Sequence, residues 1–123
     1  MLEIYSNNIT VTANQAVPFE NISVKKGCTA TLGGTSTINL NKCGVYCVNV
    51  NASTEAGTTL QLYKNGVAQS QAQSTGTNPG FTTLVQVAEN NGGCACESPV
   101  SLQVVSTDAV TLAGCNCVVT KIC

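Results

Sequence analysis

The chain has 123 residues, and its five basic and six acidic residues give a net charge of −1 without any histidine. Charged residues make up 9% of the sequence, against roughly 25% in ordinary globular domains. A chain without histidine cannot build a Ser-His-Asp triad, a Cys-His dyad or a His-ligated metal site, and a few scattered lysines argue against binding to nucleic acid. We therefore expect one non-enzymatic domain over residues 1–123 that uses no cofactor.

Short runs that alternate apolar and polar residues, bounded by Gly, Asn and Pro, predict β-strands along the whole chain. Residues 1–16 are expected to form an N-terminal arm or a first strand. The strands expected in the first half span residues 9–12, 17–24, 28–32, 35–40 and 45–51. Alternation in the last of these places Tyr46, Val48 and Val50 on one face of the strand.

The second half of the chain continues this pattern. Its expected strands span residues 58–64, 67–73, 81–88, 100–106, 108–113 and 115–122. Asn65-Gly66 predicts a type I′ hairpin between the first two, because both residues accept a positive φ. In the strand 81–88, Leu84 faces one way, whereas the other apolar residues face the opposite way. About ten short strands with this spacing predict an antiparallel sandwich or barrel.

Two motifs resemble consecutive strands of the tumour-necrosis-factor-like and complement globular-head family of jelly rolls. Residues 44–50 (Gly-Val-Tyr-Cys-Val-Asn-Val) resemble its Gly-x-Tyr-x-Phe strand, and residues 60–66 (Leu-Gln-Leu-Tyr-Lys-Asn-Gly) resemble the strand that follows. Val-Pro-Phe at residues 17–19 is similar to an early strand of the family. The sequence departs from the family at residues 91–96, where a Cys-bearing loop replaces Gly-Asp, and at residues 117–122, which lack the usual aromatic residues.

The resemblance implies an all-β, antiparallel jelly-roll sandwich that assembles as a homotrimer about a threefold axis, with Tyr46 and Phe81 near that axis. Members include phage and bacterial surface heads. From this we expect a structural or attachment module on a virion surface, a bacteriophage capsid-decoration or fibre-head protein made in the host cytoplasm without a signal peptide. Its expected partners are copies of itself, a capsid or fibre protein and a surface glycan, with no membrane insertion. The alternative is a carbohydrate- or receptor-binding head of a secreted or spore-surface protein, located outside the cell.

Eight cysteines are the main candidates for site chemistry, and an even number fits a set of disulfides. They are Cys28, Cys43, Cys47, Cys94, Cys96, Cys115, Cys117 and Cys123. Their pairing cannot be assigned from sequence, because eight cysteines allow about 105 connectivities. The two Cys-x-Cys pairs could instead supply four thiolate ligands to one metal ion, although zinc sites prefer longer spacings. A cysteine-rich metal-binding protein is therefore a further alternative, but we assign no metal site.

Overall fold

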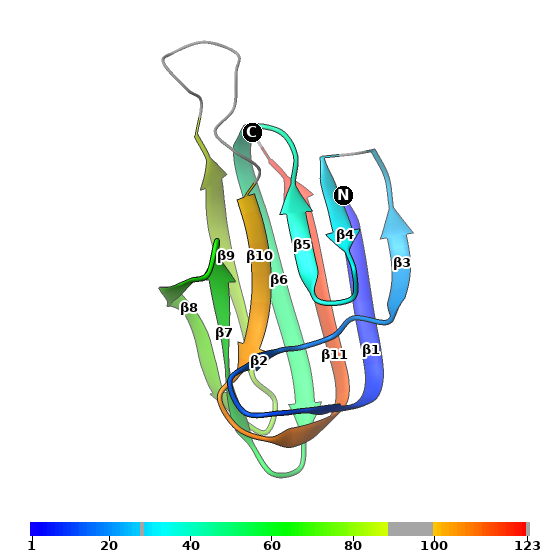
Figure 1. The fold of residues 1–123 in the computed structure, drawn as a ribbon, viewed down its shortest axis with the longest axis vertical. Helices are drawn as coiled ribbons and strands as arrows, with labels where there is room; N and C mark the ends of the chain where they lie inside the picture. Colours follow the sequence, from blue (N-terminus) through cyan, green and yellow to red (C-terminus); the bar gives the residue numbers. More distant parts are fainter. Residues whose placement is uncertain (28, 89–99, 123) are drawn as a thin grey trace.

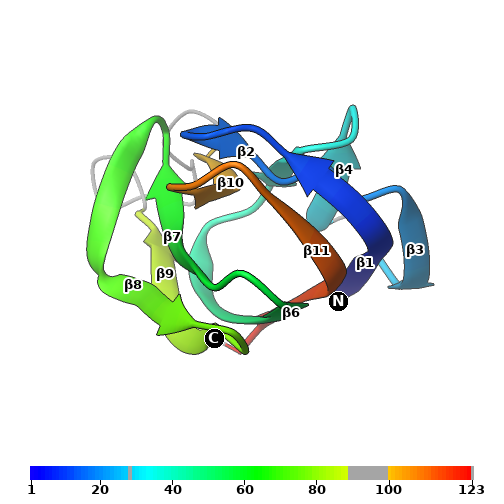
Figure 2. The same ribbon diagram turned by 90° about the horizontal axis from the view of Figure 1, so that it is seen from below.

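The computed structural model describes residues 1–27, 29–88 and 100–122. Its 11 strands form two antiparallel sheets that lie face to face (Figure 1). Viewed along the strands, the two sheets curve around a shared interior (Figure 2). The expected all-β jelly-roll sandwich is therefore confirmed.

The first sheet, which we call sheet A, has five strands. Its order is β3 (Asn21–Lys25), β1 (Leu2–Val11), β11 (Val110–Lys121), β6 (Gly44–Thr54) and β9 (Gly80–Val87). The longest strands, β1, β11 and β6, pair side by side in the middle of the sheet. Each strand in this centre is held by hydrogen bonds on both edges, so the sheet is a firm support for outward side chains.

The second sheet, sheet B, covers the inner face of sheet A. Its strands are β4 (Ala30–Gly33), β5 (Thr37–Leu40), β10 (Val100–Ser106), β7 (Thr58–Lys64) and β8 (Val67–Gly76), in that order, and the short β2 (Gln15–Ala16) also pairs with β10. The turn between β7 and β8 has φ values of 51° at Asn65 and 80° at Gly66. The predicted hairpin turn is confirmed, and its Asn65 side chain accepts a 2.8 Å hydrogen bond from the Ser101 backbone N–H.

The core lies between the sheets and is made by the alternation that the sequence predicted. Tyr46, Val48 and Val50 on β6 are fully buried, and they meet inward residues of sheet B such as Leu62 and Leu102. Burying a side chain of this size stabilises a fold by about 1.5–3 kcal/mol. Every buried side-chain nitrogen or oxygen among the described residues has a hydrogen-bond partner. In that part of the chain, no unsatisfied polar side chain reduces the stability of the core.

Two segments differ from the sequence prediction. Residues 17–20 were expected to begin a strand, but they cross from one sheet to the other, with the Val17 backbone N–H bonded to the Val104 carbonyl at 2.7 Å. Ser6 holds this crossing, because its hydroxyl donates to the Pro18 carbonyl at 2.7 Å and accepts from the Glu20 backbone N–H at 2.9 Å. The second difference is β11, a single strand where two were expected, because Gly114 stays extended and pairs with both neighbouring strands.

Candidate functional site

The outward face of sheet A presents uncharged side chains on three adjacent strands. On β11, β6 and β9 the residues that alternate with core residues point away from sheet B. They are Val118 and Thr120 on β11, Val45, Cys47, Asn49 and Asn51 on β6, and Thr82, Leu84 and Gln86 on β9. We call this set the neutral face. Because none of its residues is charged, covering it would remove no ion from water, which is the main cost of burying a polar surface.

Apolar groups gather in one part of the neutral face. Cys47 pairs with Leu84 on one side and with Thr120 on the other, so the three side chains form a row across the sheet. Leu84 is 57% exposed, whereas Cys47 is half-buried. A leucine in the middle of a regular strand gains about 1.5–3 kcal/mol when it is fully buried. The row therefore has an apolar group that this chain alone does not cover.

Amide side chains next to this row are held in fixed positions. The Asn116 amide donates to a Glu3 carboxylate oxygen at 3.2 Å, and the Ser23 hydroxyl donates to the other oxygen at 2.5 Å. The Asn51 amide donates to the Asn49 side-chain oxygen at 2.8 Å. These bonds reduce the rotational freedom of the amides before any ligand arrives, which lowers the entropic cost of binding one.

Two hollows follow one another along β11, the first near the beginning of that strand and the second near its middle. The first has a volume of about 570 Å³ and the second about 450 Å³, and both are open to solvent, the second more so. The first is lined by Asn8, Thr10, Glu55, Thr111 and Ala113, and the second by Tyr5, Asn51, Ser53, Gly114 and Asn116, among others. Ala113 lines the first hollow and the adjacent Gly114 lines the second, and we call the two hollows together the β11 groove.

The floor of the groove is low because of a β-bulge and a glycine. Between β11 and β6, Leu112 pairs with Thr54 and Gly114 with Ser53, which leaves Ala113 as an extra residue in β11. A side chain at Gly114 would stand in open space, since the nearest atom to its Cβ would be an Asn7 side-chain oxygen at 3.9 Å. The absence of that side chain in the central strand opens the second hollow.

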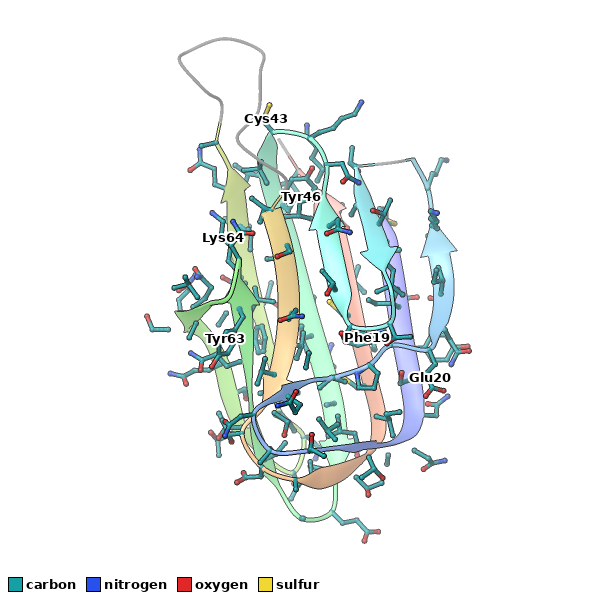
Figure 3. All side chains as sticks on the ribbon, viewed as in Figure 1. Phe19, Glu20, Cys43, Tyr46, Tyr63 and Lys64 are labelled. Carbon is teal, nitrogen blue, oxygen red and sulfur yellow. The ribbon has the colours of Figure 1, made fainter. Side chains whose placement is uncertain are left out.

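The cysteines behave differently from the sequence expectation of a full disulfide set. Cys43, which lies at the end of the sandwich where β6 begins (Figure 3), is disulfide-bonded. Cys47, Cys115 and Cys117 are free thiols. The expected disulfides at these three positions are therefore wrong, because Cys47 points outward from sheet A whereas the pair on β11 points into the core. Cys28, Cys94, Cys96 and Cys123 lie outside the described residues.

The two core thiols are poorly suited to metal binding or redox chemistry. Burial raises the pKa of Cys115 from 9.0 to about 12. Burial, and to a smaller extent the neighbouring Cys115, raises the pKa of Cys117 further. A thiol must lose its proton to act as a ligand or nucleophile, so both side chains serve as small apolar core residues. Among the described residues no group of three or more His, Cys, Asp or Glu side chains is arranged to hold a metal ion.

The two residues expected near a threefold axis, Tyr46 and Phe81, both pack against the core of one chain. Tyr46 is fully buried inside one chain, and its hydroxyl donates to the Lys42 carbonyl at 2.7 Å. The alternation on β6 directs the ring toward sheet B, so the ring itself does not lie on the surface of the chain, and the position of Tyr46 relative to a threefold axis stays a prediction. Phe81 is partly buried and packs against the same core. Cys47 and Leu84 are among the residues of β6 and β9 that face outward.

No protein-family model and no curated protein matches the sequence. Solved structures do resemble the fold. The globular domain of zebrafish complement 1qA protein superimposes with a TM-score of 0.73 and 13% identity, covering 99% of this chain and 96% of that one. Rabbit GITRL gives a TM-score of 0.61 and 9% identity, covering 100% and 95%. CBM35 from Paenibacillus barcinonensis gives a TM-score of 0.42 and 17% identity, covering 98% and 93%.

These comparisons define the class of fold: the chain has the jelly roll of complement globular heads and tumour-necrosis-factor-like proteins. Within the described residues, no helix is long and apolar enough to cross a membrane. The sequence analysis missed the β11 groove. The sequence does contain small residues at these positions, Ala52, Ala113 and Gly114. That they come together on neighbouring strands depends on pairing between distant segments, which the sequence alone does not give.

Proposed function

We propose that the chain is a non-enzymatic head domain that associates with copies of itself through the neutral face, as a homotrimer. The observation that carries the proposal is Leu84, an exposed leucine that lies opposite Cys47 on a sheet face without charges. The family resemblance supports three copies around a closed axis, a common arrangement for a soluble homo-oligomer. The high pKa of the Cys115 thiol supports a non-enzymatic role, because it removes one candidate nucleophile.

We place this head on the surface of a particle, as a decoration or fibre-head protein of a bacteriophage. The support is the resemblance of residues 44–50 and 60–66 to a family with such members, together with the low content of charged residues. Tryptic peptides of this chain in purified particles, at a copy number divisible by three, are the expected result. Their absence from particles, with the chain found only in the soluble fraction, would reject this location.

Self-association is tested by sedimentation velocity of the wild-type chain and the Leu84→Lys variant. Three lysines near a shared axis would repel one another and lose hydration, so the variant is expected to sediment as a monomer. Val67→Lys is the matched control, because Val67 is 63% exposed on the β7–β8 hairpin of the other sheet. If Leu84→Lys and Val67→Lys sediment alike, the neutral face is not the interface.

A further inference from the structure

The β11 groove has the chemistry of a binding site that self-association does not explain. The row of Cys47, Leu84 and Thr120 crosses β11 near the C-terminal end of that strand, whereas the groove follows β11 toward its N-terminal end, between β1 and β6. From Val110 to Asn116 an extended strand covers about 20 Å. The groove is therefore long enough for a short chain of linked units rather than a single small molecule.

The walls of the groove favour a neutral ligand. Glu55 is the one charged side chain among the described residues that line it, and no lysine is among them. Phosphate, sulfate and nucleic acid would meet a carboxylate without any compensating cation, which is unfavourable. A cation would find one carboxylate, fewer than such an ion normally requires. Charge thus excludes the two ionic classes of ligand.

The polar groups of the groove match a ligand with many hydroxyl groups. Asn and Thr side chains both donate and accept hydrogen bonds, as a hydroxyl group does. The fixed amide of Asn116 keeps a carbonyl oxygen and one N–H that no described residue occupies, whereas the Asn51 side-chain oxygen lies over Gly80 on β9 and leaves one N–H of that amide. Thr10 and Thr111 add a pair of hydroxyl groups that are 3.2 Å apart. Donors and acceptors therefore alternate along both walls.

The groove also offers apolar contacts of the size that a sugar ring can use. Tyr5 lines the second hollow and is partly exposed, so its ring presents an apolar edge or face to the groove. The floor carries the methyl group of Ala113 and the bare backbone of Gly114. A sugar ring has hydroxyl groups around its rim and C–H groups on its faces. Its hydroxyl groups would hydrogen-bond to the walls of the groove, and its C–H groups would pack against the floor.

We propose that the β11 groove binds a neutral oligosaccharide. This inference deepens the proposed role as a head domain, on which it rests, by giving the class of ligand that the head recognises. The ligand lies along β11, with Asn51 and Asn116 bonded to its hydroxyl groups and Tyr5 against one ring.

The test uses the full-length chain, labelled with ¹⁵N, and NMR titrations with cellotetraose, mannotetraose and chitotetraose. A sulfated tetrasaccharide and a neutral tetrapeptide are the comparison probes. At least one neutral tetrasaccharide is expected to shift the Gly114 backbone signal and the Asn51 and Asn116 side-chain signals, with the sulfated sugar and the peptide bound about tenfold more weakly or not at all. If none of the neutral sugars shifts these signals at about 10 mM, or if the peptide binds as well as the best sugar, the inference is wrong.

Gly114→Leu is the decisive variant, because its φ is not in the left-handed region and its side chain would enter open space. It should fill the groove, keep the fold and weaken sugar binding by about tenfold or more. Gln71→Leu, at an exposed position of β8 on the other sheet, is the matched control and should bind like the wild type. If Gly114→Leu unfolds at a lower temperature than the wild type, Asn116→Ala serves as the second variant. It should also weaken sugar binding.

The oligomeric state of Gly114→Leu separates the two proposals. If this variant loses self-association and no sugar binds the wild type, a second copy fills the groove and the saccharide inference fails. If the wild type binds a sugar at Gly114 as a monomer, the saccharide site stands and the proposed self-association fails.

Discussion

Cys47 and Leu84 lie directly opposite one another on β6 and β9, and both side chains point outward from sheet A. The thiol is half-buried within one chain, whereas the leucine is 57% exposed. The pair lies at the apolar centre of a surface without charges. If copies of the chain meet through this surface, the thiol should become inaccessible to reagents in solution.

The reactivity of Cys47 therefore reports on self-association. In the assembled wild-type protein we expect iodoacetamide to modify Cys47 about tenfold more slowly than in the Leu84→Lys variant. Cys115 and Cys117 should stay unmodified in both proteins until the chain unfolds, because both are buried. Peptide mapping of the alkylated protein measures each rate. Equal rates at Cys47 in the two proteins would contradict a covered neutral face.

The core thiols predict a loss of stability in alkaline solution. The pKa of Cys115 is about 12 in the folded chain against an ordinary value of 9.0, and the pKa of Cys117 is also raised. A raised thiol pKa means that the folded state keeps a proton that the unfolded state loses. The free energy of unfolding should therefore be constant below about pH 8 and fall above pH 9.0 by up to about 1.4 kcal/mol per pH unit for each thiol.

Urea denaturation between pH 7 and pH 11 checks this slope, with Cys115→Val/Cys117→Val as the control. The double variant should lose most of the dependence above pH 9.0. A smaller slope should remain, because burial also raises the pKa of Tyr46, although its hydrogen bond to the Lys42 carbonyl lowers it in part. An unchanged slope in the double variant would show that these thiols are not the cause.

The Tyr46 hydroxyl provides a test of the core itself. Tyr46→Phe removes a 2.7 Å hydrogen bond to the Lys42 carbonyl and leaves the ring in place. We expect the free energy of unfolding to fall by about 1 kcal/mol. Tyr63→Phe is the control, because Tyr63 is only partly buried on sheet B, and its effect should lie within about 0.5 kcal/mol of zero. If urea denaturation shows the same change in the free energy of unfolding for both substitutions, the Tyr46 hydroxyl does not make its hydrogen bond to the Lys42 carbonyl.

Two glycines should respond in opposite directions to replacement by alanine. Gly66 has a φ of 80° in the hairpin turn, so Gly66→Ala should destabilise the fold by about 1–2 kcal/mol. Gly114 lies in an extended strand with open space at its Cβ position, so Gly114→Ala should be neutral or stabilise the fold by about 0.5 kcal/mol. Thermal unfolding of both variants measures the two signs. A loss of stability in Gly114→Ala would mean that the floor of the groove is not open.

Local patterns in the sequence predicted much of the sandwich. The alternation in β6 correctly assigned Val48 and Val50 to the core, and the single outward apolar position of β9 was correctly identified as Leu84. The turn at Asn65-Gly66 was also predictable, because its chemistry is contained in two adjacent residues. Strand alternation and two-residue turns can be predicted locally, because neither depends on which distant segments pair.

The remaining features depend on pairing between distant residues. Gly114 reads locally as a break between two strands, and it becomes the floor of a groove only because it pairs with Asn7 and Ser53. The same is true of the cysteines, since the state of a thiol depends on which face of which strand it occupies. The position of Tyr46 relative to an assembly axis stays a prediction, since a family motif suggests where an assembly forms, whereas the alternation in β6 fixes only that this ring points inward.

The most direct test of the account is the mass of the wild-type protein in a native mass spectrum. The neutral face predicts a homotrimer at micromolar concentration, which Leu84→Lys converts to a monomer. A wild-type spectrum that contains only the 12.6 kDa monomer would contradict the central claim.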